Sequence, residues 1–449
     1  MNLLLIAYHF PPDGAIGAVR PYQFARLLPQ YGIQTWVLTV RPEHARQLNP
    51  DFQPAGIEEE RIIRTAVFPS RRDSIQRFAQ IIKALVKSGR MQPAGGSNAI
   101  TQVGAEVRRR PLLLSCFLEM LEYPDRYAGW FQPALQAVQE VTRQVQFSAV
   151  YSTSPPRTCA LIARYIAEQH HLPWIMDMRD PWITLVEGWR TTIQCPLVRA
   201  WHQKALHQCL QRASVVLANT PVLAEYFAGE YPQVAEKVRV LPNGIADTAL
   251  SAPTAHLCSD KLTIGHFGTI YGCRTTYDFL QGVSMWLQAN PQHRARLQLL
   301  FYGESAEDIA GFARQFGMSE VVHVHPPVPR TEVSSIMERC GALLLLAQQQ
   351  PMQVPGKVYE YLATGKPIIA MTESNSATGR LLQGIPLCYI AQNAEQVSHT
   401  MEQLWHQYSS GKLFCDRSDD LAPFRYSRLV EQLAGWIREA AEHSQETSP

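Results

Sequence analysis

The sequence predicts an α/β protein with two domains, each built on a parallel sheet. Short apolar runs alternate with stretches of helical period, which is typical of parallel α/β folds. The alternation stops near residues 243–260 and starts again at residue 262, so the pattern occurs twice. Glycine and polar residues follow several of the apolar runs, where such folds bind ligands. The length of 449 residues suits two or three domains.

The first apolar run, residues 3–7, is expected to be a buried strand. It has no basic leader and ends just before Pro11 and Pro12, which argues against a signal peptide. A helix follows in which Ala18, Tyr22 and Ala25 keep helical spacing. We expect further strands of this domain at residues 35–40, 149–152, 174–178, 215–218 and 238–241, with helices that include 158–169 and 197–211.

The second domain begins after a segment, residues 247–260, that is rich in Ala, Ser, Thr and Pro, as linkers often are. Its strands are expected at residues 262–267, 297–302, 321–324, 342–346, 367–371 and 387–390. We therefore divide the chain into an N-terminal domain (1–245), a C-terminal domain (246–422) and a final helix with a polar tail (423–449). The helix is expected to pack back toward the N-terminal domain.

Composition excludes several classes of protein. The chain is 46% hydrophobic with a net charge of +2, which indicates a globular protein without a general attraction to nucleic acid. No apolar run approaches the roughly 18 residues of a membrane span. The nine cysteines form no Cys-x-x-Cys pair and no cluster with zinc-ligand spacing, so we expect reduced thiols, no metal site and a cytoplasmic protein.

One segment departs from this balance. Residues 61–110 contain eleven Lys or Arg and two acids, a local net charge of +9. The segment forms most of an insertion at about residues 70–122. It is either a solvated surface insertion or a patch that binds weakly to an anionic membrane surface. It lacks the interleaved aromatic residues of a nucleic-acid site.

In the N-terminal domain, two strand ends are candidate binding loops. Gly14 and Gly17 follow the first strand and lead into a helix, an arrangement that suits a phosphate or simply makes a tight turn. The strand at 174–178 ends in Asp177, Arg179 and Asp180. Three charged residues at a strand end are hard to explain by packing alone, so they are candidate site residues, and the alternative is an internal Arg–Asp pair.

In the C-terminal domain, Gly268 and Thr269 open a glycine loop with Arg274 placed to meet a diphosphate. The alternative is an ordinary surface arginine. Further on, Lys357 and Glu360 are spaced to share one helix face, so that the lysine can meet a phosphate and the carboxylate a ribose diol. The alternative there is an exposed helical salt bridge.

Together these loops resemble the glycosyltransferase family 4 group of the GT-B fold, over roughly residues 1–440. The blocks that carry the resemblance are Phe10-Pro11-Pro12 with Gly14 and Gly17, Tyr151-Ser152-Thr153-Ser154-Pro155-Pro156, Asp177-x-Arg179-Asp180-Pro181-Trp182, Pro242-Asn243-Gly244, Gly268-Thr269-Ile270-Tyr271, and Pro355-Gly356-Lys357 through Glu360 to Pro367.

The resemblance implies a GT-B architecture, with two Rossmann-like domains whose parallel sheets face each other across a central cleft. It implies transfer of a sugar, with retention of configuration and without a required metal or other cofactor, from a nucleoside-diphosphate sugar to a polysaccharide or lipid-linked glycan. Such an enzyme would work in the cytoplasm or at the inner face of the cytoplasmic membrane.

The resemblance also assigns roles to residues. Arg274 and Lys357 would neutralise the diphosphate, Glu360 would bind the ribose, and His325 and Val328 would frame the base. The remaining donor-binding candidates are Gly14, Gly17, Gly268, Thr269 and Gly356. The catalytic candidates are Asp177, Arg179, Asp180, Arg274 and Lys357, and the acceptor-side candidates are Ser154, Asp180 and Trp182.

The sequence departs from the family pattern at three positions. Met352 stands where the first acid of the Glu-x7-Glu signature belongs, with Gln350 and Gln353 as possible replacements. Arg179 stands at the position of a histidine, and Ala246 at that of an aspartate. Two other functions therefore stay open at this point: a nucleotide-sugar epimerase, and a non-catalytic nucleotide-sugar-binding protein.

Overall fold

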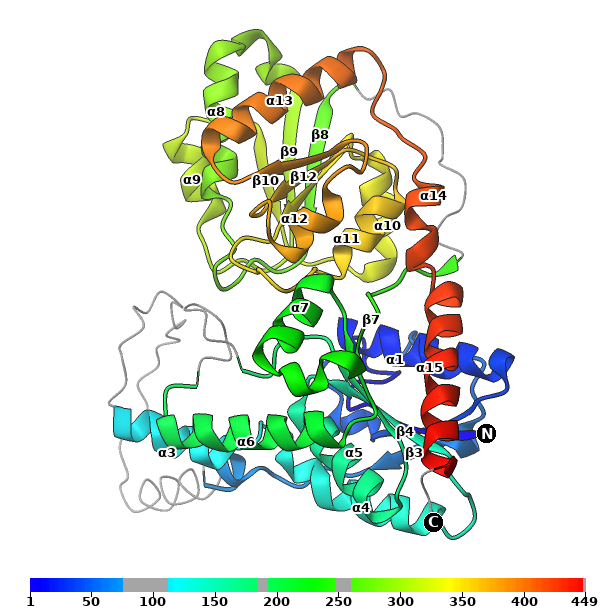
Figure 1. Ribbon diagram of the computed structural model, residues 1–449. Coiled ribbons are helices and arrows are strands. Elements are labelled where there is room, and N and C mark those ends of the chain that lie inside the picture. The colour runs from blue at the N-terminus through cyan, green and yellow to red at the C-terminus, as the bar shows by residue number, and fades with distance from the viewer. Residues whose placement is uncertain (76–111, 184–192, 248–259, 447–449) are drawn as a thin grey trace.

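The computed structural model describes residues 1–75, 112–183, 193–247 and 260–446 (Figure 1). In this part of the chain the strands form two entirely parallel sheets, with orders β3-β2-β1-β4-β5-β6-β7 and β10-β9-β8-β11-β12-β13. In each sheet the strand order reverses beside one strand, β1 or β8, which is the arrangement of a Rossmann-like domain. The predicted fold class is confirmed.

The N-terminal sheet consists of β1 (Asn2–Ile6), β2 (Gln34–Val40), β3 (Ile62–Thr65), β4 (Ala149–Ser154), β5 (Trp174–Met178), β6 (Val215–Ala218) and β7 (Val238–Val240). The helices of this part are α1 (Val19–Leu27), α3 (Leu112–Glu122), α4 (Phe131–Val141), α5 (Arg157–Gln169), α6 (Pro196–Arg212) and α7 (Pro221–Glu230).

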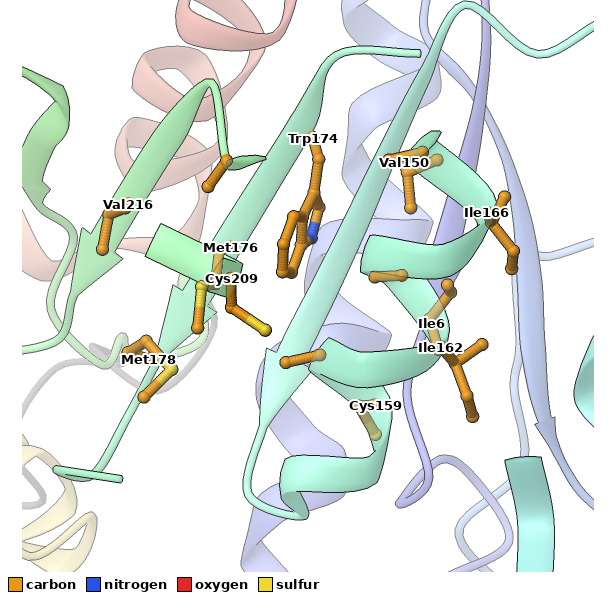
Figure 2. Packing of buried hydrophobic residues seen from close by; sticks show 14 of the residues in the cluster. Ile6, Val150, Cys159, Ile162, Ile166, Trp174, Met176, Met178, Cys209 and Val216 are labelled. Carbon is orange, nitrogen blue, oxygen red and sulfur yellow. The ribbon is translucent and has the colours of Figure 1, made fainter. Parts of the chain in front are cut away.

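Strand β5 lies between β4 and β6 and contributes three side chains to the hydrophobic core on one face of the sheet. Trp174, Met176 and Met178 alternate along the strand and pack between the helices α5 and α6 (Figure 2). The Trp174 indole is fully buried, and its Nε1 donates to Ser152 Oγ at 2.9 Å. The buried N–H of Trp174 is thus hydrogen-bonded, and this contact fixes β5 beside β4 and positions the residues that follow β5.

The C-terminal sheet consists of β8 (Leu262–Phe267), β9 (Leu297–Tyr302), β10 (Val322–His325), β11 (Ala342–Leu346), β12 (Ile368–Met371) and β13 (Cys388–Ala391). Its helices are α8 (Tyr277–Ala289), α9 (Ile309–Gln315), α10 (Arg330–Arg339), α11 (Lys357–Ala363), α12 (Ala377–Leu382), α13 (Ala394–Ser409) and α14 (Ser418–Leu421). Gly282 brings α8 close to α13, because an added Cβ would lie 2.4 Å from the Ala394 carbonyl oxygen.

The last helix, α15 (Tyr426–Glu446), leaves the C-terminal domain and runs along the N-terminal one (Figure 1). Its apolar face, which includes Leu429, Leu433 and Ile437, is buried in the same core cluster as Leu3 and Phe24. The two ends of the chain therefore share one hydrophobic core.

The carboxyl ends of the two sheets face each other. Thr220, which follows β6, donates to the Met352 carbonyl at 2.8 Å, and Asp180, which follows β5, accepts from Gln353. An exposed ion pair, Glu225 with Arg380 at 2.8 Å, joins α7 to α12. In the described residues no helix has the length and apolar character needed to cross a membrane.

Candidate active site

The loop after β1 is held by a buried aspartate. Asp13 Oδ2 lies 2.6 Å from His9 Nδ1, and Asp13 Oδ1 accepts from the backbone N–H of Ala15 at 3.0 Å. Burial alone would raise the pKa of Asp13, but the hydrogen bonds from His9 and Ala15 outweigh it, and the pKa is lowered. The ionised carboxylate therefore fixes the loop that carries Gly14 and Gly17.

The two glycines of this loop have different surroundings. An added Cβ at Gly14 would lie 2.9 Å from Asn49 Cβ, so this glycine allows close packing of the chain against itself. An added Cβ at Gly17 would lie 3.0 Å from Arg179 Nη1, so this glycine admits a charged group of the site. Of the two, only Gly17 is placed by the structure beside another candidate residue.

The structure gives Asp177 a structural role in place of the expected contact with substrate. Its side chain is 0% exposed, and both oxygens accept from Arg20 at 2.9 Å. The Tyr151 hydroxyl also donates to Oδ2, at 2.5 Å. The internal Arg–Asp pair considered above is therefore what the structure contains, and it ties α1 to β5 below the cleft.

Arg179 and Asp180, the next charged residues, do lie at the domain interface. The Arg179 guanidinium donates to the carbonyl oxygens of Gly17 at 3.1 Å and Pro155 at 2.6 Å, which orients it across two loops. Asp180 accepts from Gln353 of the other domain. Burial raises the pKa of Asp180 above its ordinary value despite the nearby Arg179 charge and the Gln353 hydrogen bond.

The other two acceptor-side candidates separate. Ser154 is buried at the end of β4, and its hydroxyl has no partner within the described residues. Trp182 is also buried, but its Nε1 donates to His202 Nδ1 at 3.2 Å and its ring belongs to the N-terminal core. Trp182 therefore packs in the core of the N-terminal domain, and its contact with an acceptor stays a prediction.

In the C-terminal domain, Lys357 reaches the glycine loop. Its Nζ donates to the Phe267 carbonyl at 2.7 Å, and an added Cβ at Gly268 would lie 2.8 Å from this nitrogen. Gly268 also has φ +119°, a conformation that favours glycine. Burial and the neighbouring Arg274 charge lower the pKa of Lys357 to about 7. Thr269, the next residue of the loop, is exposed.

The second cation lies beside this lysine. Arg274 donates to Gln350 Oε1 at 3.2 Å, and its guanidinium lies 4.7 Å from the centre of the Tyr271 ring. Glu360 is half-buried one turn after Lys357 on α11, and its charge opposes the lowering of the lysine pKa. The structure thus brings Arg274, Lys357 and Glu360 together. Gly356 stands at the start of the same helix, where an added Cβ would lie 3.3 Å from Ile16 Cγ1 of the N-terminal domain.

Next to the glycine loop, three aromatic side chains form a stack. The rings of His325 and Tyr302 are stacked at 4.4 Å with an angle of 12°, and Tyr302 stacks on Phe267 at 5.6 Å. These residues end β10, β9 and β8, so the stack runs across three neighbouring strands. Val328 is half-buried three residues beyond His325.

Sequence reasoning missed several residues at the strand ends. His266 is buried with Nδ1 2.9 Å from the Leu344 carbonyl, and burial together with the Lys357 charge lowers its pKa to about 3, so it is neutral. Asn219 and Thr220 follow β6, where Thr220 caps α7 by accepting from Leu223 N. The Asn-Thr-Pro sequence before a helical stretch is a helix-start signal that could have identified them.

Met352, which stands at the position of a signature acid, has a different use here. Its side chain packs against the core cluster of the N-terminal domain, and its carbonyl accepts from Thr220. Of the two glutamines named as replacements, Gln350 accepts from Arg274 of its own domain, and Gln353 donates to Asp180 of the N-terminal domain. The methionine is therefore a contact between the domains.

Comparison with known proteins assigns the family. A family model described as a glycosyl transferase 4-like domain matches residues 18–244, just over half of the chain. This chain belongs to that family of glycosyltransferases. The resemblance noted in the sequence is thereby confirmed.

The individual proteins to which this chain is similar are distant from it in sequence. A D-inositol 3-phosphate glycosyltransferase of Actinosynnema mirum is 23% identical over 256 residues, which cover 48% of this chain and 61% of that protein. Sucrose-phosphate synthase of Thermosynechococcus elongatus has the same fold, with a TM-score of 0.60 at 11% identity over 99% of this chain and 100% of that one. The Anabaena protein HepE, solved in complex with UDP, has a TM-score of 0.52 at 11% identity over 100% and 99% of the two chains.

Proposed function

We propose that this protein transfers a sugar from a nucleoside-diphosphate sugar to a polysaccharide or lipid-linked glycan, with retention of the anomeric configuration. The observation that carries the proposal is the pair of cations, Lys357 and Arg274, beside the Gly268 loop. They stand at the carboxyl end of β8, opposite the Gly17 loop of the other domain. When the bond between the sugar and the diphosphate breaks, negative charge grows on the diphosphate, and two fixed cations stabilise it without a metal.

The remaining roles follow from this placement. Glu360, beside Lys357, is proposed to accept hydrogen bonds from the ribose. The stack that ends in His325 is proposed to face the base, with Val328 beside it. Arg179 and Asp180 are proposed to contact the acceptor or the transferred sugar from the N-terminal side, together with Ser154.

A thermal-unfolding screen against UDP-, GDP-, ADP- and dTDP-sugars tests the donor site. A ligand at about 100 times its Kd stabilises the fold by roughly 2.7 kcal/mol, which is readily measured. We expect one base to be selected, with UDP-sugars the first choice because a protein of the same fold was solved with UDP. Glu360→Ala should abolish the shift while the surface variant Glu395→Ala keeps it, and no shift with any donor would overturn the proposal.

The alternative of a non-catalytic binding protein rested on Met352. Because this residue is a packing contact between domains, its presence does not indicate a lost activity. The epimerase alternative has no observation in its favour. An epimerase would convert the donor without an acceptor, so NDP release that depends on added acceptor separates the two.

We also propose that the enzyme works in the cytoplasm or at the inner face of the membrane. Of the basic residues in segment 61–110, Arg61, Arg64 and Arg72 pair with acids, and residues 76–111 lie outside the described part of the chain. Neutralising Arg108, Arg109 and Arg110 should weaken binding to anionic vesicles, and unchanged binding would contradict the membrane role of this segment.

A further inference from the structure

Helix α3 exposes part of its apolar surface, while both of its acids are paired. Its two acids point toward the protein: Glu119 accepts from the backbone N–H groups of Gln194 and Cys195 at 3.0 and 2.8 Å, and Glu122 pairs with Arg72. The contacts of Glu119 fasten α3 to the start of α6. A surface helix ordinarily buries its apolar side and exposes its acids.

Some apolar side chains of α3 point outward, although Cys116 and Met120 pack inward. Leu113 is 86% exposed and Phe117 is 50% exposed, and no residue of the helix is fully buried. The exposed apolar residues of α3 are Leu112, Leu113, Leu114 and Phe117. Leu113 and Leu114 lie one helical turn before Phe117, so these three side chains adjoin and form a patch rather than scattered apolar residues.

The patch continues onto α6, which lies beside α3 (Figure 1). Val198 of α6 packs against Cys116 and Met120 of α3, so the two helices are directly joined. The outer side of α6 exposes Leu197 and Trp201, and Lys204 follows one turn later.

A pocket of about 260 Å³ adjoins this face of α6. It is lined by Tyr123, Tyr165, Trp201 and Lys204 among others. The surface therefore combines aliphatic side chains, aromatic rings and a cation.

We propose that the outer face of α3 and α6 is a membrane-docking surface that inserts Leu113, Phe117 and Trp201 into the headgroup region of an anionic bilayer. Tryptophan and tyrosine favour that region because one part of each ring system is apolar and another forms hydrogen bonds. This inference rests on the proposed lipid-linked acceptor, since it brings the enzyme to the surface where such an acceptor lies.

The charges favour a bilayer over a protein partner. Helix α6 contains no Asp or Glu, and Lys204 is exposed on it. An apolar surface that carries positive charge complements anionic lipid, because apolar insertion and electrostatic attraction both favour binding.

The test is flotation of the full-length protein with vesicles of phosphatidylcholine alone and of an equal mixture of phosphatidylcholine and phosphatidylglycerol. We expect binding to the mixed vesicles only. The double variant Leu113→Asp, Phe117→Asp should weaken it by at least about tenfold, because the insertion of apolar side chains is lost. The matched control is Met285→Asp on α8, another exposed apolar residue of a helix, which should bind as the wild type does.

Three results would overturn the inference. The double variant binds the mixed vesicles as well as wild type; or it unfolds at a lower temperature, which means that the chain itself covers the patch; or the wild type is a dimer in solution that the variant turns into a monomer. Donor-induced stabilisation is measured on the same variant. If it persists while vesicle binding is lost, the docking surface is supported independently of the donor site.

Discussion

Arg274 and Lys357 divide one electrostatic task between two residues of different character. The arginine stays charged under all working conditions, whereas the lysine is held at a pKa of about 7 by burial and by the arginine itself. The first sets a constant field for the diphosphate, and the second makes the site sensitive to pH. This difference leads to two predictions at the scale of single residues.

Replacement of Arg274 by Ala should lower kcat/KM by about 10²–10³-fold, because charge on the leaving group is greatest in the transition state. We expect the fold to be unaffected, although the side chain contacts Gln350 and Tyr271. Steady-state kinetics with the selected donor measure the effect, and Arg314→Ala, an exposed arginine of the same domain, is the control. An unchanged kcat/KM would remove Arg274 from the diphosphate site.

Donor binding should weaken as pH rises above about 7, because the free enzyme then loses the Lys357 proton that the diphosphate requires. The sign for stability is opposite. The folded pKa lies below the unfolded one, so the free protein binds fewer protons than the unfolded chain and gains stability as pH rises from about 7 toward the ordinary lysine value. Calorimetric titration of donor against pH measures this. In Lys357→Arg the alkaline decrease should disappear, and its persistence would assign it to another group.

Residue identities alone did not reveal which charges are structural. Asp177 was expected in the site because a charged residue at a strand end is hard to explain by packing, but its partner Arg20 lies 157 residues earlier in the chain. Trp182 likewise meets His202 in the core. Such pairings depend on three-dimensional approach between α1, β5 and α6, which local sequence does not encode. Lys357 and Glu360, in contrast, lie within one helical turn, so their spacing in the sequence was enough to predict that they are neighbours.

At the scale of elements, helix α7 is joined to the other domain through its N-cap residue, Thr220. Thr220 caps the helix by accepting from Leu223 N at 3.1 Å, and the same hydroxyl donates to the Met352 carbonyl at 2.8 Å. One side chain therefore fixes both the helix start and the segment that precedes α11, on which Lys357 lies. This contact therefore links the start of α7 to the position of that segment.

Thr220→Ala should destabilise the fold by about 1 kcal/mol, the usual effect of losing an N-cap. It should also raise KM for the donor, because the segment before Lys357 loses its anchor on the N-terminal domain. Thr220→Ser keeps the hydroxyl and should restore both properties. Denaturant unfolding together with kinetics measures them, and an alanine variant with an unchanged KM would limit Thr220 to a helix cap.

Element prediction succeeded where the apolar period was strong and failed where it was short. The buried strands β1 and β11 were expected from uninterrupted apolar runs and are present. Strand β3 was missed, because it has four residues, one of them Arg64, and lies at the edge of its sheet. Its pairing with β2 supplies what its own sequence does not indicate.

At the scale of the whole molecule, the two domains are not independent in their cores. Helix α15 starts after the C-terminal domain but buries Leu429, Leu433 and Ile437 against the first strand and first helix of the chain. Gly244 permits this path, because an added Cβ would lie 2.9 Å from Leu429 Cδ1. The chain thus crosses between domains twice, near residue 245 and again near residue 425, where a bridge pairs Ile245 with Arg425.

This double crossing predicts that damage to the last helix unfolds the first domain. Leu433 is fully buried, so Leu433→Ala should cost about 2–5 kcal/mol, as large-to-small changes in cores do. The loss should appear as earlier exchange of the amide hydrogens of β1 and α1, while β8 and β11 keep their protection, because Leu433 packs only in the N-terminal cluster. Arg428→Ala, at an exposed position of the same helix, is the control. Equal loss of protection in both domains would instead mean that they unfold as one cooperative unit, with the interface at Thr220 and Met352 holding them together as strongly as either core.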